Sequence, residues 1–209
     1  MNKPNTQDAP IRCPYCSTEQ QHTLYPVVDL VEKPALKLGL LTDSLFSVRC
    51  TECNNRFEVM HEMLVLDKNA SFAILLAPES KLTEIKEPSE EIKNLETLRL
   101  VNTSDELKEK ILLLDAGLDD RTIELCKMYL LMKMKRPDHS LLYADYQVGE
   151  NQMLFTLFNE KGEMEETIQC TDGLYIKLVK TAQEFTLKKG YFLRIDQTWA
   201  FNEIKNSAG

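Results

Sequence analysis

The chain has 209 residues, of which 43% are hydrophobic and 28% charged, an ordinary composition for a globular protein. Its formal net charge is −8 and neither half of the chain is basic, which disfavours sequence-independent binding to a nucleic-acid backbone. No apolar run is long enough to span a membrane and the polar N-terminus lacks a secretory signal, so we expect a cytoplasmic protein.

The N-terminal part is predicted to form one small β-rich domain over residues 11–78, preceded by a disordered tail over residues 1–10. A first Cys-x-x-Cys turn (residues 13–16) is followed by a strand (21–30), a short helix (32–41) and a second strand (44–49). A second Cys-x-x-Cys turn (50–53) and a β-hairpin (56–77) complete the domain. Strand, turn and strand, repeated around a long insert, predict a zinc-ribbon-like antiparallel module.

A charged, proline-punctuated stretch over residues 79–97 is predicted to be a linker. The second domain, over residues 98–204, begins with a strand and a capping box in which Thr103 precedes Glu106 by three residues. Two predicted helices follow, ending near residues 116 and 135. Three strands then end near residues 148, 159 and 170, and a helix that ends near residue 189 precedes a last strand that ends near residue 199. The whole chain is therefore predicted to be an α+β protein.

Two Cys-x-x-Cys pairs are the strongest chemical signal in the sequence. Each pair places two thiols on one tight turn, and two such turns supply the four thiolates of a closed tetrahedral zinc site. The predicted ligands of one structural zinc ion are Cys13, Cys16, Cys50 and Cys53. Asn54 follows the second pair at a position that favours a left-handed backbone, and Ser17 holds the matching position after the first.

A competing interpretation treats Cys13 and Cys16 as a redox pair, because Cys-Pro-Tyr-Cys is also the pattern of glutaredoxin active sites. That thiol oxidoreductase chemistry requires an apolar strand before the pair and a helix after it. Residues 7–12 do not read as such a strand, and the residues after Cys16 are polar and then β-like. The sequence therefore favours the metal site over the redox site.

With these motifs in place, the chain resembles the CpXC domain family, a bacterial and archaeal family named for its cysteine pairs. The resemblance rests on the motif at residues 13–16, the Leu-rich insert that ends in Leu-Phe-Ser-Val-Arg-Cys at residues 45–50, and Arg-Phe-Glu-Val at residues 56–59. The second pair has Thr51 where a proline would repeat the motif. The resemblance implies a zinc-ribbon-like module over residues 11–78 and indicates no activity.

Three arginines beside the cysteine pairs have two interpretations. Arg12, Arg49 and Arg56 either neutralise the net charge of −2 that four thiolates on Zn²⁺ carry, or form a small binding patch for phosphate or nucleic acid. In the second case Tyr15, Phe46 and Phe57 would stack on bases, although a place in the core is favoured for them. The net charge of the chain favours neutralisation.

A predicted helix begins with a cluster of charged residues, Asp119, Asp120, Arg121 and Glu124. Acidic residues there interact favourably with the helix dipole, and the arginine can form an ion pair with a neighbouring carboxylate. A carboxylate active site there lacks a matching acid or base nearby. The chain also lacks a phosphate-binding loop and a nucleophile elbow, so the sequence disfavours an enzyme without excluding one. We expect a zinc-binding protein-interaction or regulatory module, with a nucleic-acid-binding ribbon and a thiol oxidoreductase as alternatives.

Overall fold

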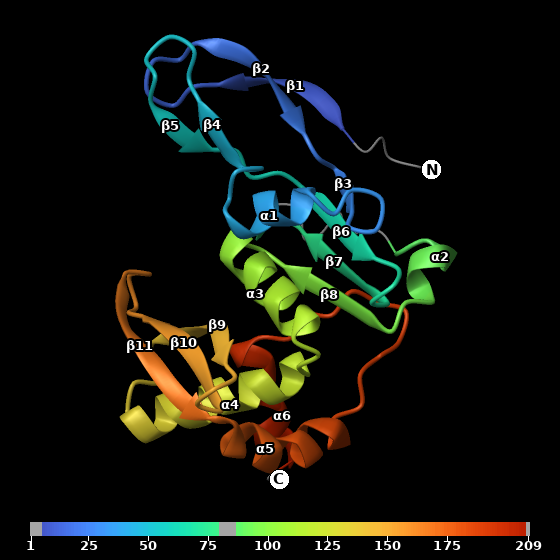
Figure 1. Ribbon diagram of the computed structural model, residues 1–209, viewed down its shortest axis with the longest axis vertical. Coiled ribbons are helices and arrows are strands. Elements are labelled where there is room, and N and C mark those ends of the chain that lie inside the picture. Colours follow the sequence, from blue (N-terminus) through green and yellow to red (C-terminus); the bar gives the residue numbers. More distant parts are fainter. Residues whose placement is uncertain (1–5, 80–86, 208–209) are drawn as a thin grey trace. The chain divides into compact units, whose positions relative to one another are not determined.

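The computed structural model describes residues 6–79 and 87–207 and has an α+β fold, as predicted (Figure 1). The chain divides into two compact units. The first comprises Met1–Lys108 with Lys189–Leu193, and the second comprises Glu109–Lys188 with Arg194–Gly209. The division falls within one helix, α3 (Ser104–Asp115).

Two short antiparallel hairpins carry the Cys-x-x-Cys turns. In the first, β1 (Gln7–Arg12) pairs with β2 (Glu19–Leu24), and in the second, β4 (Ser47–Arg49) pairs with β5 (Arg56–Glu58). The disordered tail predicted over residues 1–10 is wrong for residues 7–10. These residues belong to β1 because the first cysteine turn folds them back onto β2, where their backbone groups find partners.

A four-stranded mixed sheet forms the core of the first unit. Its strands in spatial order are β3 (Val27–Asp29), β6 (Met63–Asp67), β7 (Phe72–Leu76) and β8 (Thr97–Val101). β6 and β7 form an antiparallel hairpin, whereas the two outer strands run parallel to their neighbours. Ala73 and Ile74, neighbours that point to opposite faces of β7, are both fully buried, as expected for a strand that is covered on both faces.

Two predicted elements of the first unit are divided in the structure. The strand predicted over residues 21–30 is two strands, because Pro26 has no N–H with which to continue a ladder, and β3 pairs instead with β6. The hairpin predicted over residues 56–77 also contains two separate strand pairings, since β5 belongs to the second cysteine hairpin and only β6 and β7 pair with each other.

The boundary between the units lies further along the chain than predicted. β8, expected to open the second domain, is instead the parallel neighbour of β7 in the first sheet. Within the predicted linker, a short helix, α2 (Glu90–Lys93), precedes β8, while residues 80–86 lie outside the described residues. The helix α1 (Leu36–Leu41) lies within the predicted residues 32–41.

In the second unit, α4 (Asp120–Met134) packs against a sheet on one side and against two helices on the other (Figure 1). The sheet is an antiparallel meander of β9 (Ser140–Gln147), β10 (Gln152–Phe158) and β11 (Met164–Thr171), as predicted. The helices are α5 (Asp172–Glu184) and α6 (Gln197–Ser207). Ile123 and Leu130 of α4 face the sheet and Leu125 packs with the helices, so most of α4 is buried.

The local helix signals are also present. The Thr103 hydroxyl accepts the N–H of Glu106 at 3.1 Å, as the capping box predicts, and α3 ends before Gly117, whose φ is +65°. The strand predicted over residues 191–199 is wrong, because only Leu193 makes an isolated bridge, to Arg99, and α6 begins at Gln197.

Candidate metal centre

The two Cys-x-x-Cys turns have the same backbone structure. In the first, the Cys13 N–H donates to the Thr18 carbonyl at 2.9 Å and the Ser17 N–H donates to the Cys13 carbonyl at 2.9 Å. The second turn repeats both bonds, from Cys50 to Asn55 and from Asn54 to Cys50. Ser17 and Asn54 both have a left-handed backbone, with φ of +63° and +61°, as predicted for these two positions.

The turns bring all four predicted ligands together. The sulfurs of Cys13, Cys16, Cys50 and Cys53 lie within 4.8 Å of one another. Between the turns, the sulfurs lie 3.7 Å apart from Cys13 to Cys53 and 3.5 Å apart from Cys16 to Cys50. Four sulfurs bound to one tetrahedral zinc ion at about 2.3 Å would lie about 3.8 Å apart, so the spacing fits a four-thiolate metal site.

The thiols differ in exposure and in pKa. Cys13 and Cys50 are buried, whereas Cys16 is exposed. Hydrogen bonds with Thr18 are the main cause that lowers the pKa of Cys16 to about 6. A backbone hydrogen bond from Asn55 lowers the pKa of Cys53, but desolvation and the neighbouring thiols outweigh it and raise that pKa to about 11.

The opposing pKa shifts of Cys16 and Cys53 have a chemical consequence. Thiols this close cannot all ionise unaided, because each thiolate charge raises the pKa of its neighbours. A soft divalent cation at the centre compensates these charges, and thiolates are the ligands that such a cation prefers. The donor set therefore fits zinc.

A glutamine that sequence reasoning did not single out connects the two cysteine turns. Gln20 on β2 donates from Nε2 to the Arg49 carbonyl at 3.1 Å and accepts the Thr51 N–H at 3.0 Å through Oε1. Its side chain thus fixes the start of the second turn to the first hairpin. No local signal marks this residue, because its partners are about thirty positions away in the chain.

The three arginines beside the turns lie on the strands that flank the cysteine pairs. Arg49 and Arg56 are direct partners across β4 and β5, and both are exposed. Arg12 lies opposite Glu19 at the ends of β1 and β2, and its Nε donates to the Ser17 carbonyl at 3.1 Å.

Acidic and aromatic residues around the turns bear on the proposed binding patch. Exposed carboxylates at Glu52 and Glu58 lie in the same hairpin as two of the arginines, so the charge there is mixed. Among the aromatic residues considered for stacking, Phe46 is fully buried, whereas Tyr15 is 64% exposed. Phe46 therefore belongs to the core.

The acidic cluster at the start of α4 separates into two roles. Asp119 is the N-cap residue, since its Oδ1 accepts the Arg121 N–H at 3.0 Å, and it also pairs with the Arg121 guanidinium at 2.6 Å. This is the local pairing that the sequence predicts. Asp120 and Glu124 point instead into the interior of the second unit.

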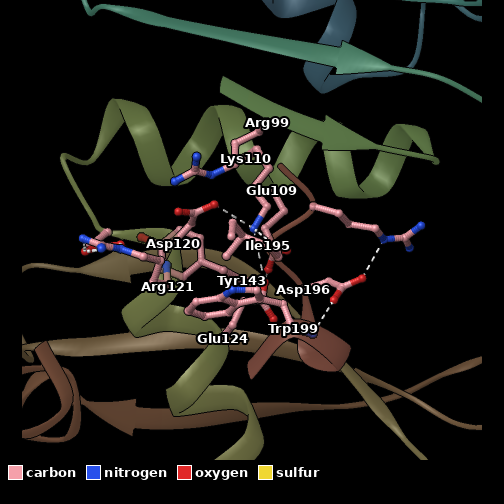
Figure 2. Close-up of polar contacts among 12 residues, drawn as sticks. Arg99, Glu109, Lys110, Asp120, Arg121, Glu124, Tyr143, Ile195, Asp196 and Trp199 are labelled. Atoms are coloured by element: carbon pink, nitrogen blue, oxygen red, sulfur yellow. Dashed lines mark hydrogen bonds and ion pairs between the residues drawn. The ribbon is translucent and has the colours of Figure 1, made fainter. Parts of the chain in front are cut away.

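There they join a buried ionic network between α3 and α4 (Figure 2). Its five ionisable residues are each at most 3% exposed: Glu109, Lys110, Asp120, Glu124 and Lys127. The Lys110 ammonium lies 3.2 Å from Asp120 and 3.3 Å from Glu124, and the Lys127 ammonium lies 2.6 Å from Glu109 and 2.9 Å from Glu124.

Backbone groups complete the hydrogen bonds of this network. Lys110 donates to the Ile195 carbonyl at 2.7 Å, and the Tyr143 N–H donates to the Glu109 carboxylate. Burial raises the pKa of Glu124 although the charges of Lys127 and Lys110 oppose the shift. The groups are enclosed, so the network connects elements of the second unit and offers no accessible acid or base.

The chain is thus an α+β protein with a candidate metal centre, at which two cysteine turns bring four thiols together. The family model described as CpXC protein matches residues 11–127, more than half of the chain, and the chain belongs to this family. No curated protein and no solved structure matches significantly. Among the described residues, every helix is too short or too polar to traverse a lipid bilayer.

Proposed function

We propose that the protein binds one zinc ion per chain through Cys13, Cys16, Cys50 and Cys53, and that this ion has a structural role. The observation that supports the proposal is the convergence of the four sulfurs within 4.8 Å. Four thiolates close the tetrahedral shell of zinc, so no position remains for a water molecule that the ion could activate. The zinc would contribute to folding and not to catalysis.

A structural ion suits the size of the hairpins that carry the ligands. β4 and β5 have three residues each, and an isolated two-stranded hairpin is at best marginally stable in water. The metal would offset the chain entropy that these strands lose on folding. The resulting module, cytoplasmic and acidic overall, would serve as a protein-interaction or regulatory module.

Elemental analysis of the purified, tag-free protein tests the metal site. We expect about one zinc ion per chain when the thiols are kept reduced and no chelator is used. Cys50→Ser should lose the ion, whereas Cys170→Ser, which changes a buried thiol of β11 outside the site, should keep it. Full zinc content in Cys50→Ser, or no metal in the reduced wild type, would contradict the proposal.

A thiol oxidoreductase remains the second candidate, because Cys16 is an exposed thiol beside another cysteine. Two observations weigh against it. The turn at residues 13–16 leads into β2 and not into a helix, and the Cys16 sulfur lies 3.5 Å from that of Cys50 on the other turn. A disulfide-reduction assay comparing the wild type with Cys13→Ser distinguishes the candidates, since only a redox enzyme loses activity in the variant.

Nucleic-acid binding through Arg12, Arg49 and Arg56 is a weaker alternative, because carboxylates alternate with these arginines. If it operates, affinity for DNA or RNA should fall steeply with salt and vanish in the triple Arg→Ala variant. Absence of binding at low salt would exclude it.

A further inference from the structure

Three chain segments run between the two cysteine hairpins and the rest of the first unit. They are residues 25–26 between β2 and β3, residues 42–46 between α1 and β4, and residues 59–62 between β5 and β6. His61 lies in the third segment, and its ring contacts all three.

The contacts use both ring nitrogens and the ring face. The Tyr25 N–H of the first segment donates to His61 Nε2 at 3.2 Å. His61 Nδ1 lies 3.3 Å from the Val59 carbonyl of its own segment. The ring centroid lies 6.0 Å from that of Phe46, a fully buried residue of the second segment, and the Val59 N–H donates to the Phe46 carbonyl at 2.8 Å.

These bonds fix the protonation state of the ring. A backbone N–H can donate only to a ring nitrogen that carries no proton, so Nε2 is bare and Nδ1 holds the proton that it donates to Val59. A proton added to Nε2 would face the Tyr25 N–H, placing two donors against each other. The Tyr25 bond therefore exists only while the imidazole is neutral.

The surroundings of the ring oppose its charged form. Desolvation is the main cause that lowers the pKa of His61, and the charge of His22 on β2 lowers it further, whereas the hydrogen bond to the Val59 carbonyl raises it. The Nε2 atom of His22 is itself buried without a hydrogen-bond partner in the described part of the chain. Glu62, next to His61 in its own segment, and Glu58 at the end of β5 are the acidic residues nearest to His61 in the sequence.

We propose that His61 makes the connection between the cysteine hairpins and the four-stranded sheet pH-sensitive: the neutral ring holds the three segments together, and its protonation releases Tyr25 and loosens the hairpins. The folded state favours the neutral ring, since its pKa is lowered from 6.5. The stabilisation is present above the unfolded pKa and is lost as the pH falls through the lower folded value. The connection does not depend on which metal the thiols bind.

NMR of the ¹⁵N-labelled, metal-loaded full chain tests this proposal. Long-range ¹H–¹⁵N spectra at pH 7.5 should show the Nδ1–H tautomer for His61. The opening equilibrium of the Tyr25 amide, obtained from hydrogen exchange after correction for the intrinsic rate, should rise by up to about tenfold per pH unit as the pH falls from 6.5, the ordinary pKa of an open imidazole, toward the lower pKa of the folded state, because one proton is taken up on opening. Cobalt substituted into the thiol site reports whether metal is retained over the same range.

Two variants separate His61 from its neighbour. His61→Gln keeps an acceptor on a side chain that does not titrate, so protection of Tyr25 should no longer depend on pH between 7.5 and 5. His22→Gln should retain the dependence. A protonated Nε2 at neutral pH, pH-independent opening in the wild type, or a pH response that survives His61→Gln or disappears in His22→Gln would each overturn the proposal. The tautomer and the ring titration are measured on the wild type and stand even if a variant fails to fold.

Discussion

Single side chains determine how closely the two cysteine turns approach each other. Ser17 and Asn54 occupy equivalent left-handed positions, a conformation that asparagine tolerates better than serine does. Gln20 then ties one turn to the other through two backbone partners. The geometry of the four sulfurs therefore depends on residues outside the two cysteine pairs.

Replacing Gln20 by alanine should weaken the metal site without removing a ligand. Two hydrogen bonds to the second turn are lost, which costs about 1–2 kcal/mol and corresponds to an affinity about 5- to 30-fold lower. Competition with a chromogenic zinc chelator measures this change. Gln21→Ala is the matched control, because Gln21 is exposed on the same strand. Equal affinities of the two variants would show that the bridge contributes nothing.

At the scale of elements, α4 combines a helix cap with a buried ionic network. Asp119→Ala removes the cap on the Arg121 N–H and the partner of its guanidinium. We expect the second unit to lose about 1–2 kcal/mol of unfolding free energy, the usual value for such a cap. Urea unfolding followed by tryptophan fluorescence measures it, with the exposed Asp138→Ala as control. A loss no greater than that of the control would rule out a stabilising cap.

The free energy of unfolding should fall more when the network between α3 and α4 loses a cation than when it loses an acid. The network contains three carboxyl groups and two ammonium groups, so Lys127→Met leaves Glu109 and Glu124 without a shared cation. Breaking a buried pair in this way costs about 3–5 kcal/mol. Lys133→Met, on the exposed side of the same helix, should cost far less. Urea unfolding at pH 7 compares them, and similar losses would contradict a network that stabilises the fold.

Glu124→Gln should be much milder and should alter the pH dependence of stability. The variant keeps an oxygen that accepts from both lysines and removes the group whose pKa burial raises from 4.5. A carboxyl with a raised pKa stabilises the fold most below its unfolded pKa, and this contribution is lost as the pH rises through the folded value. The wild type should therefore lose stability relative to Glu124→Gln as the pH increases from 4.5. Parallel stability curves would contradict this assignment.

The sequence predicts those elements whose causes are local. Cysteine spacing, the caps at Thr103 and Asp119, and the three turn-bounded strands β9–β11 depend on neighbours in the chain, and the structure contains all of them. The parallel pairings of β3 with β6 and of β8 with β7 join segments far apart, so no local pattern indicates them. The buried lysines could not be predicted either, because Lys110 and Lys127 resemble solvent-exposed helix residues until α3 and α4 are packed together.

At the scale of the whole molecule, the thiol site and the single tryptophan report on different units. All four clustered cysteines lie in the first unit, whereas Trp199 lies on α6 in the second and packs edge-on against Phe185, with ring centroids 5.8 Å apart. The CpXC match extends from the first unit into α4. Unfolding of the first unit and unfolding of the second can therefore be followed separately in one chain.

Removing the metal should unfold the cysteine hairpins and leave the second unit folded. A structural zinc site contributes about 10–16 kcal/mol of apparent free energy, more than strands as short as β4 and β5 can replace by packing. After treatment with a chelator and a reductant, hydrogen exchange should show loss of protection in β1–β2 and β4–β5. Protection of β9–β11 and the fluorescence of Trp199 should stay unchanged, since that unit has its own core of ten buried residues around Phe155. Adding zinc back should restore the hairpins. Loss of Trp199 fluorescence at the chelator concentration that unfolds the hairpins would mean that the two units fold as one cooperative structure.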